Sequence, residues 1–256
     1  MIDVPLKVWL ERDGALLRLR LARPKANLID ADMIAALRQA LAAHRGNRGL
    51  LAALLDAEGP HFSFGASVEE HLPEKCAPML ASLHALIVEM LEWPAPILAA
   101  VRGQCLGGGL ELALAASQIF AAQDARLGQP EINLGVFAPA ASCLLPPRIG
   151  QAAAEEMLCS GRSLDATQAY ALGLVVAIAD DPEAAVLAWF DRHLATKSAS
   201  SLAIALSAAR GGFLGEVRRR IAEVERLYLD KLMASRDANE GLDAFIAKRP
   251  PQWEHA

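Results

Sequence analysis

The sequence predicts an α/β protein in which a layered core is followed by a helical C-terminal segment. Up to about residue 150, short apolar runs that suit buried strands alternate with stretches of helical periodicity. From Pro182 onward the periodicity is almost wholly helical. We therefore divide the chain into a core domain, residues 1–195, and a C-terminal helical segment, residues 196–256.

The chain begins with a predicted hairpin and helix. Two alternating runs within residues 5–24 flank Asp13-Gly14, a dipeptide that suits a tight turn with positive φ. Residues 30–45 have helical periodicity, with Asp30 as the expected N-cap. Continuous apolar runs then predict strands at 49–57, 96–103 and 118–124, with helices expected at about 76–93 and 107–117.

Later elements are mainly helical. Residues 165–175 predict a helix that Gly173 ends, with a strand following. Residues 215–235 predict a strongly amphipathic helix, whose apolar stripe consists of Ile221, Val224, Leu227, Tyr228 and Leu232. Because a small appendage could not bury such a stripe alone, we expect the C-terminal helices to pack against a neighbouring subunit.

Composition excludes several functional classes. Hydrophobic residues make up 54% of the 256 residues and charged residues 21%, so a large core is expected and disorder is not. A net charge of −5 argues against a general nucleic-acid binder. The four cysteines form no CxxC pair and have no histidine at metal-ligand spacing, so we expect no metal site. With no signal peptide or membrane helix predicted, a cytoplasmic protein is expected.

Three consecutive glycines, residues 107–109, follow a predicted strand and open a predicted helix. Glycine permits unusual backbone angles and allows a ligand to approach main-chain N–H groups. The first turn of a helix also has unpaired N–H groups that suit an oxygen becoming negative during a reaction. A tight turn is the alternative for each glycine alone, but three together favour a functional role.

Two carboxylates stand near such turns. Glu111 lies in an apolar helix, where a lone carboxylate is costly unless it is hydrogen-bonded. Glu131 follows Pro130 in a loop and would be unremarkable by itself, since loop glutamates are usually solvated. A further loop, residues 62–67, contains small residues that allow close backbone approach.

Three motifs occurring in order make the chain similar to the crotonase family of enoyl-CoA hydratases and isomerases. They are FSFGAS, GQCLGGGLEL and LGQPEINLG. The resemblance covers nearly the whole chain. It implies a twisted β-sheet spiral with a C-terminal helical segment, trimers or dimers of trimers, and an acyl-CoA substrate with no separate cofactor. Other motifs, HFSFGASVEEHLP, VFAPAASCLLP and KSASSL, resemble one branch, the cyclohexa-1,5-diene-1-carbonyl-CoA hydratases of anaerobic aromatic degradation.

The resemblance also assigns roles to residues. The backbone N–H groups of Ala66 and Gly108 would bind the thioester oxygen, and Glu111 and Glu131 would be the catalytic acid and base. Adding water to an unsaturated thioester needs such a base, an acid and an oxyanion site. Phe64, Ser67 and Phe137 would line the substrate pocket. Candidate contacts for the CoA phosphates are Arg23, Lys25 and Lys248.

Two departures from the family pattern bear on the substrate. Ser67 stands where many of these hydratases have aspartate, and FAPAAS replaces a glycine-rich run after the second glutamate. Both favour a ring substrate and 1,4-addition of water over a straight-chain 2-enoyl-CoA. A straight-chain hydratase or an isomerase remains the alternative, and a non-catalytic acyl-CoA-binding module is disfavoured by the two glutamates. Nucleotide-binding and serine-hydrolase motifs do not occur.

Overall fold

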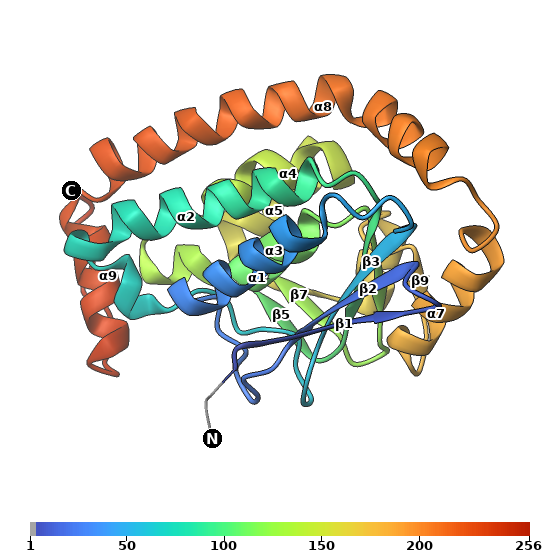
Figure 1. Ribbon diagram of the computed structural model, residues 1–256. Coiled ribbons are helices and arrows are strands. Elements are labelled where there is room, and N and C mark those ends of the chain that lie inside the picture. Colours follow the sequence, from blue (N-terminus) through green and yellow to red (C-terminus); the bar gives the residue numbers. More distant parts are fainter. Residues whose placement is uncertain (1–3) are drawn as a thin grey trace.

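The computed structural model describes residues 4–256, which form a sheet-and-helix core crossed by a long C-terminal helix (Figure 1). The larger sheet has the strand order β1-β2-β3-β4-β6-β9, with every neighbouring pair parallel except β1-β2. Its strands are β1 (Leu6–Glu11), β2 (Leu16–Leu21), β3 (Ala52–Ala57), β4 (Ile97–Val101), β6 (Gln118–Ala121) and β9 (Ala177–Ile178). A smaller sheet consists of β5 (Gln104–Leu106), β7 (Arg126–Gly128) and β8 (Ser163–Asp165).

Helices cover both faces of the larger sheet. The helices of the described residues are α1 (Ala31–His44), α2 (Pro73–Leu91), α3 (Gly108–Leu114), α4 (Pro139–Ile149), α5 (Gln151–Ser160), α6 (Ala166–Ala171), α7 (Pro182–His193), α8 (Ala199–Leu227) and α9 (Arg236–Ile246), not all of which contact that sheet. Two 3-10 turns, η1 (Val68–His71) and η2 (Pro130–Leu134), and a π-helical turn, η3 (Tyr228–Leu232), complete the elements described. This α/β arrangement confirms the predicted fold class.

The N-terminal hairpin is confirmed, but its loop is longer than a two-residue turn. Arg12, Asp13 and Gly14 all have positive φ, at 54°, 55° and 89°. The predicted cap of α1 is also confirmed, because the side chain of Asp30 accepts the N–H of Met33 at 2.9 Å. A side-chain acceptor there satisfies one of the unpaired amides of the first turn.

Successive side chains along a strand of the larger sheet point to opposite faces, and each face contributes to a separate hydrophobic cluster. Ala53 and Leu55 of β3 face the main core beneath α1 and α2, whereas Leu54 faces Phe190 of α7. This period of two is what a strand covered on both faces produces, and it accounts for the continuous apolar run in the sequence. The predicted strands at β3, β4 and β6 are therefore confirmed.

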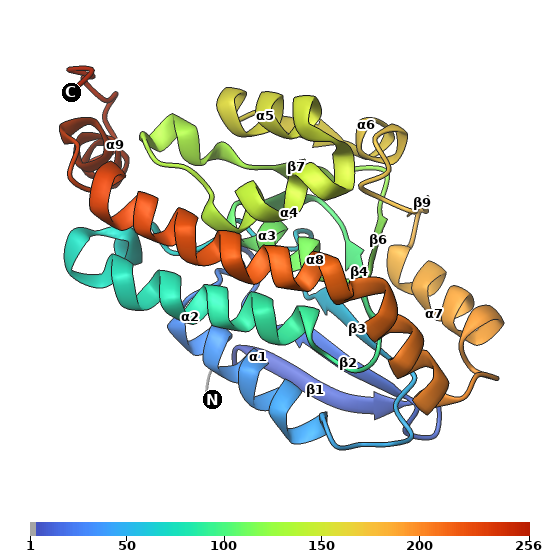
Figure 2. The ribbon, with the colours of Figure 1, turned by 90° about the horizontal axis from the view of Figure 1, so that it is seen from above.

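The C-terminal segment crosses the core of its own chain. Figures 1 and 2 both show α8 passing over α2 and α4, with α9 lying at one end of the molecule. Val217 and Ile221 are buried in the main core, and Tyr228 is fully buried against Phe137. Much of the apolar stripe is thus covered within the chain, although Leu227 remains 46% exposed. Packing on a neighbouring subunit stays a prediction.

None of the described helices is long and apolar enough to cross a membrane.

Because α9 lies very close to η2, we expect a larger side chain at the contact to destabilise the fold. A Cβ on Gly241 would lie 2.1 Å from the carbonyl oxygen of Leu134, so Gly241→Ala must push α9 away. We expect the free energy of unfolding to fall by about 1–3 kcal/mol, as for other overpacked sites. Urea unfolding measures this change.

Gly215, inside α8, supplies a matched control, since nothing lies within 4 Å of a Cβ built there. Gly215→Ala should raise the free energy of unfolding by about 0.5–1 kcal/mol through helix propensity. Equal effects of the two substitutions would contradict the tight contact between α9 and η2.

Candidate active site

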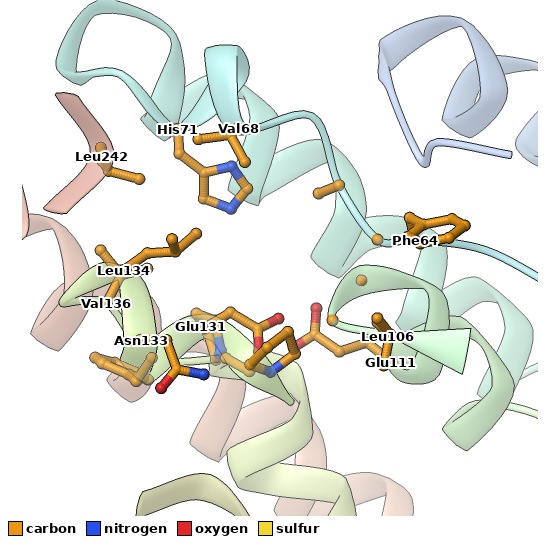
Figure 3. Close-up of a pocket in the computed structure, with 18 of the residues that line it drawn as sticks. Phe64, Val68, His71, Leu106, Glu111, Glu131, Asn133, Leu134, Val136 and Leu242 are labelled. Carbon is orange, nitrogen blue, oxygen red and sulfur yellow. The ribbon is translucent and has the colours of Figure 1, made fainter. Parts of the chain in front are cut away.

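A cavity of about 430 Å³ lies where α3, η2, the start of α4 and α9 meet the loop after β3 (Figure 3). Most of the described residues that line it are glycine, proline or apolar. Four have polar side chains: His71, Glu111, Glu131 and Asn133. An apolar cavity with a few polar groups is the usual form of a small-molecule site. Within residues 4–256, no cluster of three or more His, Cys, Asp or Glu side chains could hold a metal ion.

The glycine turn before α3 makes room for a carboxyl group. Gly107 has a φ of 51°, and a Cβ there would lie 2.6 Å from Oε1 of Glu131. The N–H of Gly107 donates to the carbonyl of Gly128 at 2.9 Å, which ties the turn to the smaller sheet. A side chain at residue 107 would therefore displace Glu131 from the cavity and strain the turn.

Two backbone segments meet beside this turn, and the role of their N–H groups as donors to a thioester stays a prediction. A Cβ on Gly108 would lie 3.1 Å from the nitrogen of Ala66, so the two segments are in close contact. Gly65, with a φ of 104°, allows the loop to approach. Neither the Ala66 nor the Gly108 N–H donates to another residue in the described part of the chain. Both segments line the cavity, so these donors are available to a bound oxygen.

Glu111 is held by the start of α4. Its side chain is only 3% exposed, and its Oε1 accepts the N–H of Ala141 at 2.8 Å. Burial raises the pKa of Glu111, while the N–H groups of Ala141 and Ala140 act in the opposite direction by stabilising the carboxylate. This explains how a helix surrounded by leucines accommodates a carboxyl group.

Glu131 stands in η2 on the same cavity. Burial, followed by repulsion from the charge of Glu111, raises the pKa of Glu131 to about 8. Gln129 is buried beside it, and its amide nitrogen, oriented toward Glu131, lies 3.0 Å from each carboxylate oxygen. That donor favours the ionised form and so restrains the rise in the pKa of Glu131.

The two glutamates form a coupled pair. The pKa of each group is raised, and because like charges share one cavity, the titration belongs to both groups together. One carboxyl and one carboxylate can supply an acid and a base in the same reaction. The structure brings both predicted glutamates together. Their catalytic role stays a prediction.

The predicted pocket residues have different positions. Phe64 and Phe137 line the cavity as expected. Ser67 is not among the lining residues, and its place in the substrate pocket stays a prediction. Its carbonyl instead accepts a hydrogen bond from Nδ1 of His71 at 2.8 Å, because Ser67 directly precedes the 3-10 turn η1.

None of the proposed CoA-binding residues lines the cavity. Arg23 forms ion pairs with Asp30 and Asp32 at 2.8 and 3.2 Å. Lys25 and Lys248 are exposed. Their contacts with CoA phosphates stay a prediction.

Three parts of the site were not found from the sequence. Gln129 directly precedes Pro130 and Glu131 within the motif LGQPEINLG, and this position is the local signal that could have drawn attention to it; its burial is known only from the structure. Two further parts of the lining come from segments distant in the sequence: His71, and Leu242 and Phe245 of α9. No spacing or motif in the sequence predicts that these segments meet.

Comparisons with known proteins agree along nearly the whole chain. Residues 11–256 match the family described as enoyl-CoA hydratase/isomerase. Cyclohexa-1,5-dienecarbonyl-CoA hydratase of Thauera aromatica is 64% identical over 98% of this chain and 97% of that protein. A probable enoyl-CoA hydratase of Bacillus subtilis is 33% identical over 92% of this chain and 94% of that protein. The crystal structure of an enoyl-CoA hydratase/isomerase from Pseudoalteromonas atlantica, 29% identical, superposes with a TM-score of 0.85, covering 97% and 99% of the two chains.

The coupling of the two carboxyl groups can be measured directly. Glu111→Gln removes a like charge, so the pKa of Glu131 should fall below about 8. It should stay above its usual value, because burial remains. Carbon-13 NMR titration of glutamate labelled at the side-chain carboxyl measures the pKa.

Glu156→Gln is the control, since Glu156 is an exposed residue paired with Arg162. This substitution should leave the titration of Glu131 unchanged. If Glu131 titrates identically with and without Glu111, the two groups do not interact.

Proposed function

Because the chain belongs to the enoyl-CoA hydratase/isomerase family, we propose that it hydrates cyclohexa-1,5-diene-1-carbonyl-CoA to 6-hydroxycyclohex-1-ene-1-carbonyl-CoA. The observation that carries this proposal is the extent of identity to the Thauera aromatica hydratase, which spans both proteins almost completely. The cavity supports it, because two carboxyl groups and two open amides face one apolar space. CoA enters as part of the substrate, and no separate cofactor takes part in the proposed reaction.

The amides would act on the thioester. A carbonyl oxygen placed between the N–H groups of Ala66 and Gly108 draws electrons from the ring, so the β-carbon becomes electrophilic. When hydroxide adds to that carbon, negative charge collects on the thioester oxygen, where both N–H groups can donate. Fixed donors aimed at a developing oxyanion are worth about 10²–10³ in rate each.

The glutamate pair would handle the protons. The carboxylate removes a proton from water as its oxygen bonds to the β-carbon, and the carboxyl group returns a proton to the extended dienolate. Protonation at the remote γ-carbon leaves one ring double bond in place, so the net change is a 1,4-addition of water. The pair neither gains nor loses a proton overall, so each turnover leaves it ready for the next.

The apolar wall favours a ring over a straight chain. Phe137 and the two residues that follow it, Ala138 and Pro139, line the cavity at the start of α4. These residues belong to the stretch that departs from the glycine-rich family pattern. They add side-chain volume beside Glu131, where a flat ring can fill the space.

The position of the added hydrogen tests the proposed reaction. In deuterated water, the label should enter the γ-carbon of the ring, and NMR of the product locates it. The cyclic diene should also be hydrated faster than crotonyl-CoA. Deuterium at the α-carbon, or preference for the linear substrate, would favour the straight-chain hydratase. Label exchange without water addition would favour an isomerase.

Substitution of the glutamates provides the control for this chemistry. Glu111→Gln and Glu131→Gln should each reduce kcat by orders of magnitude, and the double variant should be little worse, because the groups act as a unit. A single variant with near-parental turnover would remove that residue from the mechanism.

We also propose that the chain forms a homo-oligomer, a trimer or a dimer of trimers. Apolar side chains of the C-terminal segment remain outside its own core, with Ile204 71% exposed, Leu227 46% and Phe245 54%. Light scattering at micromolar concentration should give a mass of three or six chains. A strict monomer would contradict the proposal.

A further inference from the structure

His71 introduces a nitrogen into an otherwise apolar part of the cavity. It is the last residue of η1, five positions after Ala66. Figure 3 shows its ring and Glu131 on opposite sides of the cavity, with Val68 and Leu242 beside the imidazole. The two carboxyl groups therefore approach a bound ring from one side, and His71 approaches it from the other.

The hydrogen bond to Ser67 fixes which nitrogen carries the proton. Nδ1 of His71 lies 2.8 Å from the Ser67 carbonyl oxygen, which can only accept, so Nδ1 is the donor. Burial lowers the pKa of His71, partly offset by that bond, which favours the neutral ring. Nε2 then carries only a lone pair, and it has no hydrogen-bond partner among residues 4–256.

A neutral imidazole in this state cannot act as an acid toward the substrate. It can only accept a hydrogen bond, and the lining side chains near it offer no donor, since Val68, Leu134 and Leu242 are apolar. A ligand hydroxyl satisfies such an acceptor. A carbonyl, an ether or a fluorine does not, because each of them also lacks a proton to donate.

We propose that His71 is a specificity-determining residue, which accepts a hydrogen bond from a hydroxyl group on a saturated carbon of the acyl ring. The substrate class extended in this way is cyclic acyl-CoA thioesters that carry a ring hydroxyl on the side away from the two glutamates. The inference rests on the proposed function, because the thioester must sit at Ala66 and Gly108 for the ring to reach His71.

Stable saturated analogues test this without requiring turnover. Cyclohexanecarbonyl-CoA and its 3- and 4-hydroxy and 3- and 4-fluoro derivatives, each as separate cis and trans isomers, are titrated by calorimetry. Fluorine resembles hydroxyl in size but cannot donate. In the parent protein, at least one hydroxy isomer should bind about 3- to 10-fold more tightly than its fluoro counterpart, as expected for one net hydrogen bond.

Two variants separate this role from a structural one. His71→Asn keeps an N–H in position to donate to Ser67 but has no atom at the place of Nε2. His71→Leu removes both polar atoms. Each should bind the hydroxy and fluoro analogues equally, whereas loss of loop structure alone would weaken all analogues alike and leave their ratio unchanged.

The outcomes distinguish the inference from the proposed function. Absence of any hydroxyl preference in the parent, or its retention in either variant, overturns the role of His71. Failure of the parent to hydrate the cyclic diene overturns the proposed function, and it leaves the measured binding ratios intact.

Discussion

The surrounding structure has to offset the mutual repulsion and the desolvation of two carboxyl groups that face one apolar cavity. Glu111 and Glu131 can face the same space only if donors offset part of the cost of removing their charges from water. The N–H of Ala141 serves Glu111, and the amide of Gln129 serves Glu131. Gly107 then has to lack a side chain, because a Cβ would occupy the space of the second carboxyl group.

The C-terminal segment depends on the same arrangement. η2 carries Glu131, and α9 packs so closely on η2 that Gly241 has no room for a methyl group beside the carbonyl of Leu134. The next residue of α9, Leu242, lines the cavity. The docking of α9 and the position of the Glu131 carboxyl group are therefore linked, so a substitution in α9 can alter both the stability of the fold and the geometry of the cavity.

The sequence predicted those elements whose formation depends on neighbouring residues, such as a tight turn or a helix cap. The alternating runs around Asp13-Gly14 predicted the hairpin, and Asp30 predicted the start of α1. The smaller sheet was not predicted, because a strand of three residues such as Arg126–Gly128 has no measurable periodicity. Its strands exist through pairing with distant segments, which a single sequence does not reveal.

The same distinction applies to the site. Gly108 and Glu111 stand out in the sequence, because a glycine run and a carboxylate in an apolar helix are each costly without a role. Glu131 was found only through its place in the motif LGQPEINLG. His71 does not stand out, because a histidine in a loop is common, and only the folded chain places it opposite Glu131. The predicted place of Ser67 in the substrate pocket stays a prediction, because the structure shows only what its backbone contacts. The 3-10 turn that begins at Val68 directs its carbonyl to His71.

The cavity consequently has two ends with different tolerance to change. The end proposed to bind the thioester presents backbone N–H groups, which persist with many side chains as long as the glycine turn keeps its geometry. The opposite end is built from side chains of η1, η2, α4 and α9, where one substitution alters shape or hydrogen bonding. Chemistry at the thioester can therefore be retained while the acyl group changes. In the proposed function, residues such as Phe137 and His71 would determine which ring is accepted, without touching the N–H groups that would donate to the oxyanion.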